Sequence, residues 1–313
     1  MLVKAFDAPQ AALSFVVAQL AYIEPRVWEA QYPEITYPMN VPVDNAAPPW
    51  TKTVTYFSSD KVGKTDWING RAGDVPLVGT NRQKFETEVH MQGVGFDYTI
   101  EEINQARMAG INLTDDLAKA ARRAYEETCQ RIAYVGDTPK GFTGLLNTAS
   151  VTAATVANGA NSSPLWTQKT PDEILADFNT AINGIWTTTL QIAMADTVLL
   201  PPAKYAYLAT TRLTNLAERT LLSWIKENNI YTQQTGRPLN IRALNECAGA
   251  GSGATDRMVV YRNSDEVLKM HVPMPLQFLP PQPEGFRVIV PGMFRLGGVD
   301  VRLPKQIRYY DGF

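Results

Sequence analysis

The chain has 313 residues, of which 45% are hydrophobic and 19% are charged, enough for one large domain or two ordinary domains with a buried core. Its formal net charge is -2, which indicates neither a basic surface that binds nucleic acid nor an acidic disordered tail. Cys129 and Cys247 are the only cysteines. This number excludes a disulfide framework and fits a reducing compartment.

The first 49 residues predict a helix and then an extended segment. Residues 8–31 have a helical pattern with a break at Pro25, and polar residues interrupt their apolar run. No small-residue cleavage site follows, so we expect an amphipathic helix, not a signal peptide, and the run is too short to cross a bilayer. Residues 32–49 are rich in proline and are predicted to be extended.

Two strands with a long polar connection come next. Residues 50–58 alternate threonine with apolar residues, and residues 83–100 form a second strand region in which the apolar phase flips around Gly93. Such a flip favours a β-bulge. The connection, residues 59–82, is rich in Gly, Asp, Asn and Lys. An isolated two-stranded ribbon is marginally stable in water, so other structure must support this one.

A short helix over residues 99–109 and a long amphipathic helix over residues 113–135 are predicted from apolar residues at three- and four-residue steps. Thr114 is the expected N-cap. Gly136 and Gly141 have the spacing of a phosphate-binding loop, but Phe142 stands where that loop needs lysine. We therefore interpret this stretch as a helix end followed by a turn.

The second half predicts alternating helices and strands. Thr170, Pro171 and Glu173 form a capping-box helix start. The glycine-rich stretch 248–256 precedes a strand and not a helix, so a flexible hairpin connection is expected there in place of a dinucleotide site. The remaining assignments are a surface loop at 148–163, helices at 203–209 and 214–228, strands at 197–200, 239–244, 257–261, 286–290 and 299–303, and a proline-rich domain crossing at 273–283.

No convincing catalytic group emerges from the sequence. His90 and His271 are the only histidines, and a nucleophile pair of Cys129 with either of them is formally possible. Cys129 lies beside the apolar stripe of the long helix, so we expect a small core residue. No His, Cys or carboxylate cluster has the spacing of metal ligands. We predict an α+β protein with no catalytic residue, cofactor or metal.

The order of these elements resembles the major capsid proteins of tailed phages with the Hong Kong 97-type fold. RRAYEETCQRIAYVGD followed by GFTGLLN is similar to the exit of their spine helix, and VDVRLPKQIRYYDGF is similar to their closing strand. The resemblance assigns residues 1–49 to an N-terminal arm and 50–98 to an extended β-hairpin, the E-loop. Residues 99–165 and 273–313 become a peripheral domain with the spine helix, and 166–272 an axial domain.

The resemblance implies a structural protein, not an enzyme, that self-assembles into the pentamers and hexamers of an icosahedral shell around double-stranded DNA. It implies no membrane contact and no sequence-specific DNA binding, and it makes scaffold, portal and decoration proteins candidate partners. The virion capsid, assembled in the host cytoplasm, is the implied location. The alternative is an encapsulin-like compartment with protein cargo, and a cytosolic enzyme with a long flap is the weaker hypothesis.

Four residues of the polar connection are candidate contacts between subunits. Some capsid proteins of this type crosslink an E-loop lysine to an asparagine of a neighbour, and Lys61 and Lys64 lie in the matching loop. No motif selects the asparagine, so solubilising lysines are the preferred interpretation. Trp67 and Ile68 are large apolar residues in an otherwise polar segment, and we expect them to dock on an adjacent subunit. The alternative is that Trp67 folds back onto its own hairpin.

Overall fold

The computed structural model describes residues 32–67, 77–110, 112–213 and 219–313. Residues 35–313 form one compact unit, whereas residues 1–34 belong to another. The helix expected over residues 8–31 lies outside the described residues. Within the described ranges, no helix combines the length and the apolar character that crossing a bilayer requires.

A five-stranded sheet with two buried faces lies between two hydrophobic cores. Because side chains alternate along a strand, Leu199 and Val259 enter one core, while Val198 and Val260 enter the other. The strands lie in the order β7 (Thr152–Thr155), β17 (Ile307–Asp311), β10 (Arg257–Tyr261), β8 (Thr197–Leu200) and β9 (Asn240–Ala243). The strands expected at 197–200 and 257–261 are confirmed with their predicted bounds.

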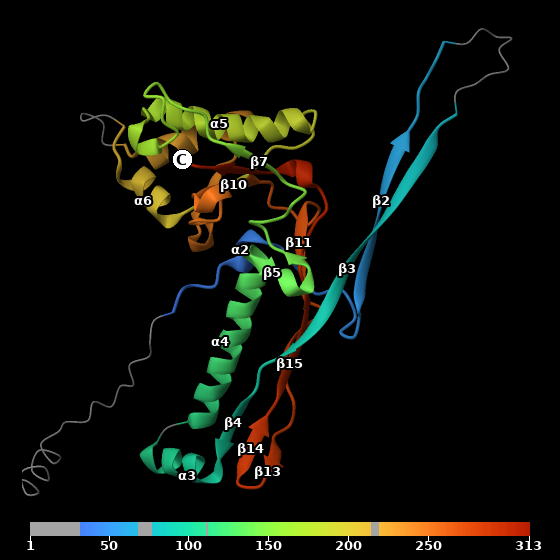
Figure 1. The fold of residues 1–313 in the computed structure, drawn as a ribbon, viewed down its shortest axis with the longest axis vertical. Helices are drawn as coiled ribbons and strands as arrows, with labels where there is room; N and C mark the ends of the chain where they lie inside the picture. Colours follow the sequence, from blue (N-terminus) through green and yellow to red (C-terminus); the bar gives the residue numbers. More distant parts are fainter. Residues whose placement is uncertain (1–31, 68–76, 111, 214–218) are drawn as a thin grey trace, which may run out of the picture. The chain divides into compact units, whose positions relative to one another are not determined.

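Four helices supply the core on one face of this sheet (Figure 1). The predicted capping box is confirmed at the start of α5, where Thr170 and Glu173 each bond the backbone of the other. Phe178, Ile182 and Ile185 of this helix are fully buried. The helices are α5 (Pro171–Thr188), α6 (Pro202–Thr210), α7 (Leu221–Asn228) and α8 (Ile230–Thr235).

The long helix α4 (Leu113–Tyr134) contributes to the core on the other face and confirms the long helix predicted over residues 113–135. Its N-cap is Asn112 and not Thr114 as predicted, because the Asn112 carbonyl already accepts the backbone N–H groups of Asp115 and Asp116. At its end Gly136 has a left-handed φ of 79°, which glycine adopts without a Cβ penalty. A turn of β5 (Gly136–Asp137) and β6 (Phe142–Thr143) follows.

The segment that leads into this core is not fully extended, which corrects the prediction for residues 32–49. A single helical turn, α2 (Tyr37–Asn40), packs on α4, because the Asn40 amide donates to the Tyr134 hydroxyl at 2.8 Å. Tyr261 donates its hydroxyl proton to the Asn40 carbonyl at 2.7 Å. The next strand, β1 (Val43–Asp44), joins β11 (Leu268–His271) and β16 (Val299–Val301) in a three-stranded sheet.

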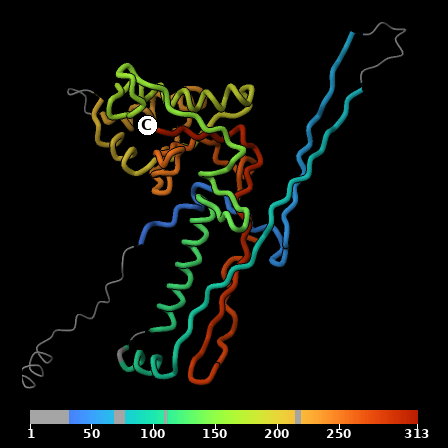
Figure 2. Tube along the Cα trace, viewed as in Figure 1, coloured from blue at the N-terminus to red at the C-terminus, as the bar shows by residue number. Residues whose placement is uncertain are grey.

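The two predicted ribbon strands are β2 (Thr53–Val62) and β3 (Gly79–Gly93), which pair in antiparallel register (Figure 2). β3 continues into a sheet with β15 (Gly292–Gly297) and β12 (Met274–Phe278). The expected bulge at Gly93 is instead a break between strands. β4 (Phe96–Thr99) pairs with β14 (Arg287–Val290), which also pairs with β13 (Gln282–Glu284), and α3 (Ile100–Ala109) follows β4.

The reason for this break lies on the partner strands. Pro291 separates β14 from β15 and has no N–H group to continue a ladder. At Gly95 a Cβ atom would lie 2.8 Å from the Val290 carbonyl oxygen, so the chain needs glycine where it changes partner. The apolar phase of the sequence therefore flips because the strand leaves one sheet and enters another.

Three other expectations are corrected by the topology. The glycine-rich stretch 248–256 does not close a hairpin, because β8 lies between β9 and β10. Part of the loop expected at 148–163 is strand β7. The proline-rich segment 273–283 contains β12 and the start of β13, and its role as a domain crossing stays a prediction. Helix α7 begins at Leu221, so the helix expected over 214–228 is shorter, and residues 214–218 are outside the described part.

Gly144 is predicted to be indispensable for the exit of the spine helix. A Cβ atom there would lie 2.3 Å from the backbone carbon and oxygen of Tyr134. We expect Gly144→Ala to lower the free energy of unfolding by about 3 kcal/mol through this backbone clash, measured by urea denaturation. Gly79→Ala is the control, because its Cβ meets nothing within 4 Å. Equal stability of the two variants would contradict this packing.

Candidate intersubunit surface

The ribbon of β2 and β3 has no support from other strands over most of its length. Its register runs from Thr53 opposite Glu88 to Val62 opposite Gly79, whereas β15 pairs with β3 only over residues 89–93. In the described part of the chain, both outer edges of this ribbon are therefore unpaired. Unpaired strand edges and exposed apolar side chains such as Phe57 and Val62 are suited to contact another chain.

The base of the ribbon is fixed to the body by aromatic and charged side chains. Tyr56 of β2 stacks on Phe85 of β3 with ring centroids 5.0 Å apart. The Arg302 guanidinium lies 4.6 Å from the centre of the Tyr56 ring, and its Nε donates to Asp300 at 3.0 Å. Arg302 follows β16 directly, so this cation–π contact attaches the ribbon to the three-stranded sheet.

That sheet also carries a row of charged residues across its three strands. Lys269 Nζ lies 2.6 Å from Asp44 Oδ2, and this interaction holds the pKa of Asp44 below its usual value. His271 is buried between Asp44 and Asp300, with its ring nitrogens 3.5 and 3.6 Å from their carboxylates. The row links β1, β11 and β16 and ends at Arg302 beside the ribbon.

Cys129 is confirmed as a core residue. It is fully buried on α4, and its thiol contacts the hydroxyl groups of Tyr37 and Tyr125. Burial raises the pKa of the thiol to about 11, so the nucleophilic thiolate is scarce at neutral pH. Across the described ranges, no three His, Cys, Asp or Glu side chains are grouped so that they could hold a metal ion.

The candidate contact residues lie toward the tip of the ribbon. Lys61 is the last but one residue of β2, and Lys64 and Trp67 follow that strand; all three are exposed. Trp67 is fully exposed, and its backbone N–H donates to the Asp66 side chain, so the indole does not pack on the described residues of its own hairpin. Ile68 lies outside the described residues.

A second exposed apolar surface, which the sequence did not predict, lies at the turn between α5 and β8. Leu190 and Ile192 are 83% and 79% exposed, and Leu190 and Gln191 have left-handed φ angles of 53° and 67°. Side chains rarely adopt this conformation without a compensating contact. The signal in the sequence that could have found this surface is the apolar pair Leu190 and Ile192, which directly follows a helix end without a glycine.

The comparisons with known proteins decide the family. Residues 63–313 match the model of the major capsid protein family. The chain belongs to this family. The expected role as a structural protein of a capsid shell is thereby confirmed. No curated protein sequence matches the chain.

Solved capsid structures share the fold of this major capsid protein, which confirms the predicted α+β class and Hong Kong 97-type fold. The capsid of the Myoviridae phage XM1 is 18% identical with a TM-score of 0.80, over 95% of this chain and 98% of that chain. The structure from Mycobacterium phage Ogopogo is 12% identical with a TM-score of 0.61, over 95% of this chain and 98% of that chain. The virus-like particle from Pyrococcus furiosus is 14% identical with a TM-score of 0.51, over 87% of this chain and 91% of that chain.

The contact between Arg302 and Tyr56 leads to a prediction about the ribbon. We expect Arg302→Ala to speed hydrogen exchange of the amides of β2 and β3, because the ribbon base loses its cation–π contact. The free energy of unfolding of the subunit should change by about 1 kcal/mol or less. Arg219→Ala is the matched control, since Arg219 pairs with Glu227 of α7 and neither residue lines a pocket with the ribbon. Unchanged exchange in Arg302→Ala would contradict the attachment.

Proposed function

We propose that this chain self-assembles into the pentamers and hexamers of an icosahedral shell that encloses the double-stranded DNA of a tailed phage. The E-loop ribbon supplies the main contact between neighbouring subunits. The observation that carries the proposal is the exposed ribbon, with unpaired edges and a fully exposed Trp67 at the end of its described part. Membership of the major capsid protein family supports the same conclusion.

A two-stranded ribbon buries too little apolar surface to be stable alone. Among the described residues, its strand pairing and its cation–π contact with the body lie at its base. A neighbouring copy that covers the exposed apolar side chains would supply the missing burial. Because each subunit both donates and receives such a contact, the contact closes a ring within a capsomer.

The charge of the chain fits a container for DNA. With a net charge of -2, the subunit has no large basic excess, so it should not hold phosphates tightly. We propose that it encloses DNA without sequence-specific contacts. Scaffold, portal and decoration proteins are the proposed partners, and the host cytoplasm is the proposed place of assembly.

The nucleic-acid content of purified shells separates this function from its alternative. Particles made during infection should contain double-stranded DNA, measured by absorbance and nuclease protection. Shells that contain protein cargo and no DNA would favour an encapsulin-like compartment. Expressed subunits that stay monomeric at high concentration, in light scattering and electron microscopy, would contradict both shells.

The role of Trp67 can be tested by truncation. We expect Trp67→Ala to leave the subunit folded with nearly unchanged thermal unfolding, because the fully exposed indole packs on none of the residues that the structure describes. Shell formation should weaken, since truncating a buried interface anchor costs about 2 kcal/mol or more per contact. Light scattering and negative-stain microscopy measure assembly.

Lys64→Ala is the matched control, because Lys64 is exposed in the same segment and should contribute little to a desolvated contact. Normal particles from Trp67→Ala would show that Trp67 does not dock on a neighbour. Unfolding of the isolated variant subunit would show that Trp67 belongs to the core of its own chain.

A further inference from the structure

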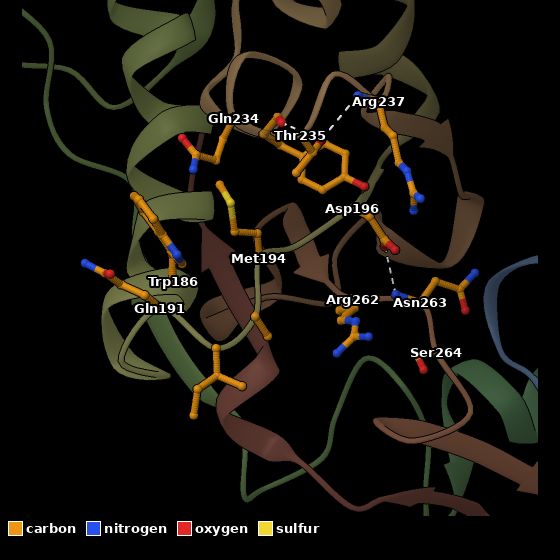
Figure 3. Close-up of a pocket in the computed structure, with 13 residues that line it drawn as sticks. Trp186, Gln191, Met194, Asp196, Gln234, Thr235, Arg237, Arg262, Asn263 and Ser264 are labelled. Atoms are coloured by element: carbon orange, nitrogen blue, oxygen red, sulfur yellow. Dashed lines mark hydrogen bonds between the residues drawn. The ribbon is translucent and has the colours of Figure 1, made fainter.

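An open pocket lies on the body of the subunit and receives no residue from the ribbon (Figure 3). Its volume is about 710 Å³, which is in the size range of binding sites for side chains and small ligands. It lies between the end of α5, helix α8 and the segment that follows β10. A neighbouring copy could reach it without displacing the ribbon of the same chain.

The pocket combines apolar walls with two cations. Trp186, Met194 and Tyr231 supply apolar surface, and Arg237 and Arg262 supply positive charge. Neither arginine has a carboxylate within 4.0 Å among the residues that the structure describes. Such a site fits an aromatic side chain that is next to an acidic group.

One carboxylate already belongs to the pocket, and its position matters for the charge balance. Asp196 lines the wall, but its Oδ1 accepts hydrogen bonds from the Thr197 hydroxyl at 2.9 Å and from the Asn263 backbone N–H at 2.8 Å. Two arginines against one aspartate leave a positive balance, so an added carboxylate is attracted to the site.

The ribbon carries a segment with the complementary chemistry. Asp66 precedes the fully exposed Trp67, and its Oδ1 accepts the backbone N–H of Trp67 at 2.9 Å. This local bond holds an acid and an indole next to each other and leaves the second carboxylate oxygen to accept from a partner. The pair therefore offers a negative charge that balances the two arginines and an aromatic ring that packs on the apolar walls of the pocket.

We propose that Asp66 and Trp67 of one copy bind in this pocket of a neighbouring copy. The indole packs on Trp186 and Met194, and the Asp66 carboxylate accepts hydrogen bonds from Arg237 and Arg262. The inference rests on the proposed shell, since it requires a second copy of the chain. It assigns the acceptor site for the ribbon tip.

A competing acceptor is the pocket of about 770 Å³ beside the turn at Leu190. The chain's own ribbon forms one of its walls through Ser58 and Asp60, and Lys305 is its only cationic lining residue. That pocket has no aromatic lining residue. It therefore matches an indole and a carboxylate less well, and Lys305 provides a control for the test.

A charge exchange tests the pairing. We expect Asp66→Arg and Arg237→Glu each to reduce the yield of shells about tenfold, because each places like charges in contact. The double variant Asp66→Arg with Arg237→Glu should recover to within about threefold of the wild type, because the ion pair is restored with reversed polarity. Lys305→Glu, the control, should assemble like the wild type. Yields are measured by gradient sedimentation after thermal unfolding shows that each subunit is folded.

The outcomes separate the two hypotheses. If the wild type forms shells but the double variant does not recover, the assigned pocket is overturned and the shell function stays intact. Loss of assembly in Lys305→Glu with normal assembly in Arg237→Glu would place the ribbon tip in the competing pocket and overturn the inference. Failure of the wild type to form particles would overturn the proposed function, and the inference with it.

A covalent link gives a second measurement that does not depend on charge reversal. Thr65→Cys with Gln234→Cys places one thiol beside Asp66 and another on the rim of the pocket. Oxidation of assembled shells should give a ladder of linked chains, because thiols join only when their Cα atoms are close. The native Cys129 and Cys247 are buried. The assignment would be overturned if this pair gave no ladder while Thr65→Cys with Lys305→Cys gave one.

Discussion

The burial of both faces of the five-stranded sheet holds the body of the subunit together. Side chains of β8 and β10 alternate between two cores, one built on α5 and the other on α4. A sheet buried on both sides cannot shift its register by one residue without placing every side chain in the wrong core. The register of β8 and β10 is therefore fixed by both cores at once, within the compact unit of residues 35–313.

This arrangement explains why the ribbon can be long and exposed. Its base is fixed by stacking of Tyr56 on Phe85 and by Arg302, which follows a strand of the body. Beyond the base, no described residue of the ribbon belongs to either core, so the exposed apolar side chains described there are not needed for folding of the subunit. Residues that are costly to expose and unnecessary for folding are best explained by a partner. In a capsid protein that partner is another copy, and the acidic and aromatic tip of the ribbon is complementary to the pocket with two arginines.

Strong local signals in the sequence were sufficient for much of the fold. The capping box at Thr170 and the buried strands at 197–200 and 257–261 were predicted correctly, because each signal acts within a few residues. Trp67 was also found from the sequence as an exposed aromatic residue. The acceptor pocket was not, because Trp186, Arg237 and Arg262 come together only when α5, α8 and the end of β10 pack side by side.

The sequence by itself determined the helix that begins with the capping box at Thr170, the buried strands at 197–200 and 257–261, and the core position of Cys129, because each depends on a pattern of nearby residues. The order of such elements along the chain was enough for the resemblance to phage capsid proteins. Only the tertiary structure decided that β8 lies between β9 and β10, so that residues 248–256 form a crossing and not a hairpin. It also decided that the phase change at Gly93 is a change of sheet, because Pro291 interrupts the partner strand. Pairing between distant strands depends on which buried faces meet, and periodicity along one segment carries no information about its partner.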